Sequence, residues 1–188
     1  MYGSLLREED VLQSAYGVAA FAFAMPWAIP ANLRIAKATM RKALELSTPI
    51  LTQKDICIHR NYEGHDDCFD VTRIPEGNWR SEPPSTLYIA REAARWAVER
   101  GIDTILVVAA DPHASRCCRD IQLALAEANE PDITIELVSF IESDGALPQE
   151  GWFRSNSPRF RFRFRWLWRL RELTLNHIPV VLYRSFCG

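Results

Sequence analysis

Residues 104–116 have the sequence TILVVAADPHASR, an apolar run that breaks at Asp-Pro. Apolar, largely β-branched residues of this length predict a strand over 104–110 that is buried on both faces, and such strands are typical of parallel sheets. Asp111 can cap the helix that follows, and Pro112 suits the first turn of that helix. The stretch therefore predicts a parallel sheet, with His113 and Arg116 at the carboxyl end of one strand.

Strand and helix patterns alternate along most of the chain on either side of this stretch. In the helix over 85–100, Ser85 is a plausible N-cap and Gly101 a plausible C-terminal stop. The alternation predicts a three-layer α/β, Rossmann-like fold with a mainly parallel sheet of about five strands, as a single domain over 1–188. The other predicted elements are strands over 17–25, 49–58, 71–74 and 133–140 and helices over 32–46, where Asn32 is the expected cap, and 112–129.

Composition indicates an ordinary globular protein, with 48% hydrophobic and 24% charged residues. The five cysteines are too few and too irregularly spaced for a disulfide scaffold, which favours a reducing compartment. The longest apolar run, 18–30, is too short for a membrane span, and the residues before it do not form a basic leader. We therefore expect a cytoplasmic protein.

The C-terminal part of the chain is basic. Residues 151–188 contain eight arginines and one acidic residue, about +7, whereas residues 1–150 carry about −9. Within the basic part, arginine alternates with aromatic residues in the segment 159–171. This pattern predicts an extended segment that turns helical near Trp166. The apolar residues 178–183 are expected to form an edge strand or a dimer contact.

Two interpretations of the Arg/aromatic segment 159–169 remain open. Arginines interleaved with aromatic rings can bind single-stranded nucleic acid or lie on an anionic membrane surface. Alternatively, the rings cover the sheet or a partner subunit while the arginines pair with the acidic remainder of the chain. We favour the second interpretation, and expect neither nucleic acid nor a membrane surface as the partner, because nucleic-acid binders usually have a more extended basic surface.

Polar residues that precede or begin two successive helices predict a ligand site. The loops that lead into such helices lie at one edge of a parallel sheet. An imidazole can exchange protons near neutral pH, a carboxylate can orient it, and a guanidinium can grip a phosphate or carboxylate. On the alternative interpretation, Asp111 and Ser85 are only helix caps and Arg116 is a solvated helix residue. The candidate residues are Glu82, Ser85, Thr86, Asp111, His113 and Arg116.

A metal site is not expected. The four potential ligands Cys57, His59, His65 and Cys68 lack the tight paired spacing of structural zinc sites. The adjacent Cys117 and Cys118 are interpreted as small apolar residues on a buried helix face.

The order of these features resembles the YdcF-like domain family, which includes the SanA proteins. The resemblance rests on Glu82, Ser85 and Thr86 at a helix start, the strand 104–110, His113 and Arg116 in a His-x-x-Arg pattern, and an Arg171-Glu172 pair in a late helix. It implies a Rossmann-like fold and S-adenosylmethionine binding, which is reported for one member. Other members are linked to cell-envelope physiology, without a settled reaction.

The sequence therefore predicts a YdcF-like domain that binds a small anionic or nucleotide-like ligand at the carboxyl edge of the sheet. His113 is expected to transfer a proton or form a hydrogen bond, Arg116 to clamp an anion, and Arg171 with Glu172 to close the site. Glu82 and Asp111 would orient them, and Ser85 and Thr86 would donate to ligand oxygens. Whether the protein is a transferase or hydrolase acting on a phosphate-bearing or S-adenosylmethionine-like compound is left open, as is homo-oligomerisation. The alternative is a non-catalytic interaction protein that uses the segment 159–169.

Overall fold

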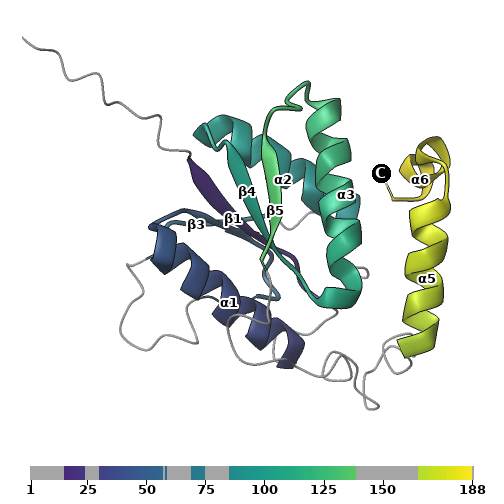
Figure 1. Ribbon diagram of the computed structural model, residues 1–188, viewed down its shortest axis with the longest axis horizontal. Helices are drawn as coiled ribbons and strands as arrows, with labels where there is room; N and C mark the ends of the chain where they lie inside the picture. Colours follow the sequence, from purple (N-terminus) through teal and green to yellow (C-terminus); the bar gives the residue numbers. More distant parts are fainter. Residues whose placement is uncertain are drawn as a thin grey trace, which may run out of the picture.

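The computed structural model describes residues 15–23, 30–56, 58, 69–74, 85–138 and 165–187. Figure 1 shows a central sheet with helices on both sides of it and a helical pair at one flank. The elements, in chain order, are β1 (Tyr16–Ala20), α1 (Pro30–Leu46), β2 (Ile50–Thr52), β3 (Val71–Arg73), α2 (Thr86–Arg100), β4 (Thr104–Val108), α3 (Asp111–Glu127), β5 (Thr134–Leu137), α5 (Arg165–His177) and α6 (Val180–Cys187).

The five strands form one sheet in the order β3-β2-β1-β4-β5, and every neighbouring pair is parallel. This confirms the predicted α/β fold with a mainly parallel sheet. Val18 of β1 stands opposite both Ile50 of β2 and Leu106 of β4, so β1 is the central strand and β4 is one of its two neighbours. Successive strands run from β1 outward in one direction and from β4 outward in the other. The carboxyl ends of β1 and β4 are therefore the topological switch point of the sheet.

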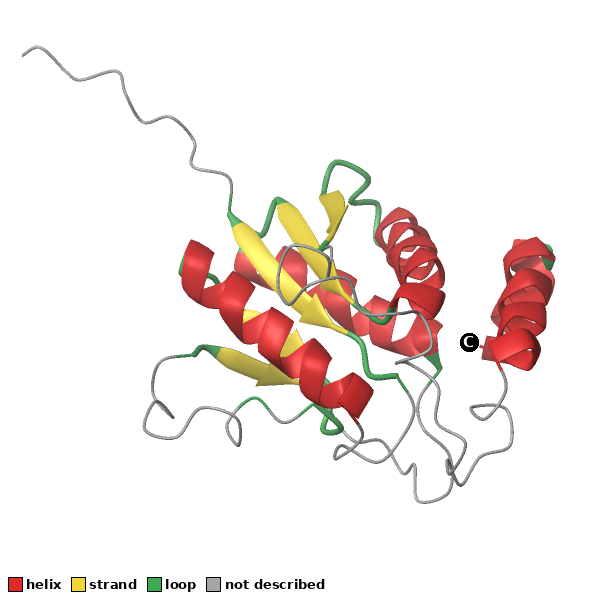
Figure 2. Ribbon diagram, turned by 60° about the horizontal axis from the view of Figure 1, so that its bottom comes forward, coloured by secondary structure: helices red, strands yellow, loops and turns green. Residues whose placement is uncertain are grey.

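Helices cover both faces of the sheet (Figures 1 and 2). The hydrophobic core consists of two clusters of buried side chains, one on each face of the sheet. Leu106 and Val108 of β4 belong to the cluster that contains α1, whereas Ile105 and Val107 belong to the cluster of α2 and α3. Side chains of a strand alternate between its faces, so a strand covered on both sides must be apolar at every position. The run 105–108 of β4, which follows Thr104 at the start of the strand, is apolar throughout.

The helices α5 and α6 form the helical pair at the flank, beside α3 and farther from the sheet than α3 (Figures 1 and 2). Two large side chains from this pair are buried: Trp168 of α5, in the cluster on the α1 side of the sheet, and Tyr183 of α6. The C-terminal helices are thus attached to the sheet domain near the switch point.

Helix α2 has the ends that the sequence predicts. The Oγ of Ser85 accepts a hydrogen bond from the backbone N–H of Tyr88 at 3.1 Å. Gly101 ends the helix with φ +62°, a left-handed conformation that glycine adopts without strain.

The first two strands are shorter than the predicted 17–25 and 49–58. After β1, the N–H of Ala22 donates to the side chain of Gln53 and the N–H of Phe23 to the side chain of Asn32. Side-chain acceptors thus replace strand partners, and the strand ends. Asn32 lies inside the first turns of α1 and bonds across to Phe23; the prediction that it begins the helix is wrong by two residues.

Two further predictions about helix and strand ends are wrong. The N-cap of α3 is Ala110, and Asp111 lies in the first turn, where its carboxylate faces the positive end of the helix dipole without capping it. The apolar residues 178–183 do not form an edge strand, because α6 begins at Val180. The segment 159–171 becomes helical at Arg165, close to the predicted position, and its first part lies outside the described residues.

Candidate functional site

The candidate site lies at the carboxyl end of β4, where α3 begins. The first turn of α3 contains Pro112, which suits this position because its ring lacks an N–H. The N–H of His113 donates to the carbonyl of Ala110 at 2.7 Å, so the imidazole is carried by the first helical turn. The chain after β1 lies next to it, since the ring of Phe23 is 6.5 Å from that of His113 between centroids.

His113 is buried between aromatic rings and a guanidinium group. Its ring lies edge-on to Trp168 of α5, with centroids 5.9 Å apart, and Trp168 also contacts Phe23 at 4.9 Å. The Nη2 of Arg116 lies 3.1 Å from the Nδ1 of His113. Because a guanidinium only donates, Nδ1 must accept, and the proton of the neutral imidazole resides on Nε2.

The surroundings of His113 disfavour its charged form. Burial lowers the pKa of His113 well below the usual 6.5, and the positive charges of Arg116 and Arg171 lower it further. The imidazole is therefore neutral at pH 7. Of the two roles that the sequence leaves open for His113, this state favours hydrogen bonding over proton exchange near neutral pH.

Arg116 forms a buried ion pair with α5. Its Nε donates to the Oε2 of Glu172 at 2.8 Å, and the two side chains are only 4% and 9% exposed. Burial by itself lowers the pKa of Arg116, but Glu172, and to a smaller extent Tyr183, raise it, and the net shift is upward. The interpretation of Arg116 as a solvated helix residue is therefore wrong.

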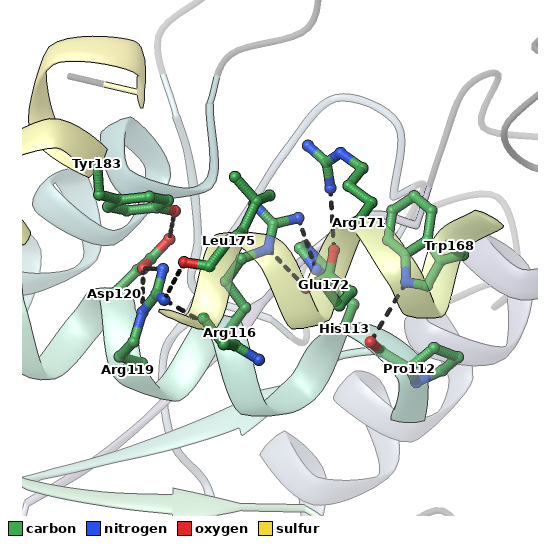
Figure 3. Close-up of polar contacts among 11 residues, drawn as sticks. Pro112, His113, Arg116, Arg119, Asp120, Trp168, Arg171, Glu172, Leu175 and Tyr183 are labelled. Atoms are coloured by element: carbon green, nitrogen blue, oxygen red, sulfur yellow. Dashed lines mark hydrogen bonds and ion pairs between the residues drawn. The ribbon is translucent and has the colours of Figure 1, made fainter. Parts of the chain in front are cut away.

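Glu172 bridges two guanidinium groups. Its other oxygen, Oε1, accepts from the Nη1 of Arg171 at 2.9 Å, and this guanidinium also lies 5.2 Å from the centre of the Trp168 ring. The indole Nε1 of Trp168 donates to the carbonyl of Pro112 at 3.3 Å. Figure 3 shows these contacts along the junction between α3 and α5.

A second polar cluster, which the sequence analysis missed, lies farther along α3. Asp120 is fully buried and accepts from the hydroxyl of Tyr183 at 2.5 Å and from the guanidinium of Arg119 at 2.8 Å (Figure 3). Arg119 also donates to the carbonyl of Leu175 on α5 at 2.8 Å. The spacing alone could not reveal it: residues 113, 116 and 120 are polar and share one helix face, a pattern that usually marks a face exposed to solvent.

The structure brings together four of the eight predicted site residues: His113, Arg116, Arg171 and Glu172. Their side-chain contacts within the described residues run between α3, α5 and Phe23, and do not include Ser85 or Thr86. Ser85 caps α2, and Thr86 is buried in its first turn. Asp111 is exposed at the start of α3, and Glu82 lies outside the described residues.

The described residues include no group of three or more histidine, cysteine or acidic side chains that could hold a metal. The candidate ligands Cys57, His59, His65 and Cys68 lie outside the described part of the chain. Cys117 is a buried free thiol, and burial raises its pKa well above the usual 9.0. A thiol in this state is a poor nucleophile, which fits its interpretation as an apolar packing residue.

A groove of about 350 Å³ lies elsewhere, on the outer side of α2 and α3. It is open to solvent and contains none of the predicted site residues. Its lining residues are Arg91, Ala94, Arg95, Val98, Glu99, Ala124, Glu127 and Ala128.

The chain was compared with family models, curated proteins and solved structures. No family model, curated protein or solved structure matches it. The resemblance to the YdcF-like family therefore stays a prediction. Among the helices that the structure describes, none has both the length and the apolar character needed to cross a membrane.

Proposed function

We propose that the protein binds a small anionic or nucleotide-like ligand at the carboxyl edge of its sheet, beside the switch point between β1 and β4. The observation that supports this most is the convergence of His113, Arg116 and Arg171 from two helices on that edge. Open α/β sheets bind their ligands outside the carboxyl ends of the strands, at the switch point.

The charges of the site favour an anion. Besides burial, the positive charges of Arg116 and Arg171 lower the pKa of His113, so two cationic groups act on the imidazole, and both are paired with Glu172. The positive end of the α3 dipole is at the same place, where the N-cap residue is Ala110, and the Asp111 carboxylate in the first turn offsets part of this positive potential. A phosphate or carboxylate group is stabilised in such a potential.

The two arginines have different roles in this proposal. The side chain of Arg171 is 34% exposed and can reach a ligand, whereas Arg116 is buried against Glu172. We therefore assign the anion contact to Arg171 and a positioning role to Arg116, which holds α5 and the imidazole of His113 in place. His113 is itself only 6% exposed, so in this proposal the ligand must enter at the carboxyl edge of the sheet to accept a hydrogen bond from its Nε2–H.

A thermal-shift experiment tests the proposal with inorganic phosphate, ATP and S-adenosylmethionine, the last being the ligand that the family resemblance implies. A ligand at 100 times its Kd stabilises a protein by about 2.7 kcal/mol, which corresponds to roughly 5–10 °C for a chain of this size. We expect at least one probe to produce such a shift in the wild-type protein.

The variant Arg171→Gln removes the charge of the proposed anion contact without opening the Arg116–Glu172 pair. Loss of an arginine contact to an anion is expected to weaken binding about tenfold, because charge-assisted hydrogen bonds are the strong ones. The matched control is Arg95→Gln, which removes an exposed arginine on α2. The proposal is rejected if none of the three probes shifts the melting temperature, or if both variants bind the probes as the wild type does.

A further inference from the structure

Exposed apolar side chains are concentrated on the C-terminal helical pair. Nine large hydrophobic residues are exposed in the described part of the chain, and six of them belong to α5 and α6. Soluble surfaces rarely gather apolar side chains in this way unless something binds there. The six residues are Trp166, Leu170, Leu173, Val180, Val181 and Leu182.

Three of these residues form a stripe along α5. Trp166, Leu170 and Leu173 are spaced four and three residues apart and therefore share one helix face, and they are 63%, 56% and 63% exposed. Trp168 and Glu172, which contact α3, lie on the other side of the helix. Helix α5 thus has one apolar face toward solvent in addition to the face that packs against α3.

The two tryptophans of the Arg/aromatic segment are therefore separated by the fold. From the sequence, we expect the aromatic residues of this segment to cover the sheet or a partner subunit and not to lie on a membrane surface, and the exposed face of α5 is what departs from this expectation. Trp168 does pack into the core, but Trp166 points away from it. The outward face is left for a partner.

The charge of the helical pair indicates what kind of partner fits this face. Residues 165–187 contain a single acidic residue, Glu172, and its side chain is buried in ion pairs. Arg169, in contrast, is exposed on α5. In the sequence, three more arginines alternate with phenylalanine at 159–164, directly before the helix. An apolar stripe bordered by arginine and by no exposed acid on its own helices fits an anionic, apolar partner.

We propose that the outward face of α5 docks on an anionic membrane surface, with α5 lying in the interface. Helices that bind in this way present tryptophan and leucine on one side and arginine or lysine beside them. A second copy fits less well, because a two-fold contact places the same basic residues opposite one another. Binding at this face leaves the proposed ligand site, on the other side of α5, unchanged.

Vesicle sedimentation tests this proposal. We expect the protein to bind vesicles of phosphatidylcholine with 25% phosphatidylserine at low salt, and to bind vesicles of phosphatidylcholine alone at least tenfold more weakly. Binding to the anionic vesicles should also fall as salt is added, because surface charges are screened.

Variants locate the binding face. The double variant Leu170→Gln with Leu173→Gln is expected to lose more than tenfold in vesicle affinity, since two apolar side chains no longer enter the interface. Leu137→Gln, which changes a half-exposed leucine on β5, is the matched control and should bind as the wild type does. Arg169→Gln is expected to bind about fivefold more weakly and Arg95→Gln to bind normally.

All of these substitutions are at exposed positions, and circular dichroism with a melting curve checks that each variant is folded. The proposal is overturned if the wild-type protein does not sediment with anionic vesicles at low salt, if it binds both kinds of vesicle equally, or if the double leucine variant binds normally. Light scattering without lipid tests the alternative partner. If the wild-type protein is a dimer and the double leucine variant is a monomer, the face binds a second copy instead, and the proposal is overturned.

Discussion

The ion pair between Arg116 of α3 and Glu172 of α5 is expected to be a main attachment of the C-terminal helices to the sheet domain. The substitution Glu172→Gln removes the negative charge and keeps the shape of the side chain. Because the two side chains are only 4% and 9% exposed, the guanidinium of Arg116 would then be a buried charge with a neutral partner. Burial disfavours such a charge, and water cannot easily reach it.

The expected cost is large for a single substitution. Removal of one partner of a buried ion pair typically destabilises a protein by about 3–5 kcal/mol. For a chain of this size each kcal/mol lowers the melting temperature by about 2–4 °C, so the variant should melt roughly 10 °C below the wild type. The matched control Glu99→Gln removes an exposed carboxylate that lies 3.7 Å from Arg95. It should cost less than about 0.5 kcal/mol, or about 2 °C.

Thermal and urea unfolding measure these differences. A third variant, Arg116→Met with Glu172→Met, removes both charges and should recover most of the lost stability, since apolar replacement of a buried pair is often close to neutral. Two results would refute the reasoning: a Glu172→Gln variant that melts within about 2 °C of the Glu99→Gln control, or a double variant that is less stable than Glu172→Gln alone.

Three further substitutions test other parts of the structure. Because the pKa of His113 is lowered in the folded protein, the unfolded chain takes up the proton first as the pH falls. The free energy of unfolding should therefore fall below about pH 6.5, by at most about 1.4 kcal/mol per pH unit. In melting curves recorded from about pH 7 to pH 5, His113→Gln should show a smaller fall than the wild type. Tyr183→Phe should cost about 1–3 kcal/mol in urea unfolding, because it removes the 2.5 Å hydrogen bond to the buried Asp120, and an unchanged midpoint would mean that α6 is not held by this bond. Gly17→Ala should destabilise by about 1–3 kcal/mol, because the new methyl group would lie 2.6 Å from the ring of Trp96, and a variant as stable as the wild type would show that this packing is looser than described.

The sheet and its central helices follow closely from local patterns. After Thr104, every residue of β4 is apolar because the strand is covered on both faces, and helix α2 has a serine cap and a glycine stop that mark its two ends. Signals of this kind are contained within a few neighbouring residues. They do not depend on how distant segments pack, and the sequence therefore predicts them well.

The C-terminal helices could not be predicted in the same way. The run Val180-Val181-Leu182-Tyr183 has high β-propensity, but short apolar runs are ambiguous between strand and helix. As a helix it places the Tyr183 hydroxyl against the buried Asp120, a contact between residues 63 positions apart. Tertiary contacts of this kind override local propensity.

The candidate site was predicted in its residue types and only partly in its geometry. The His-x-x-Arg pattern and the Arg171-Glu172 pair do meet, but the sequence does not show that α5 buries Arg116 and leaves Arg171 accessible. That outcome depends on the docking of one helix against another. It moves the proposed anion contact from Arg116 to Arg171.

The most direct test of the proposed ligand site is nitrogen NMR of the His113 imidazole during titration with phosphate, ATP and S-adenosylmethionine. In the free protein we expect a neutral ring at pH 7 with its proton on Nε2, because Nδ1 accepts from Arg116. Binding of a ligand should shift the Nε2 resonance of His113 and leave that of the exposed His177 at the end of α5 unchanged. A charged imidazole at pH 7, or no response of His113 to saturating amounts of all three compounds, would contradict the account.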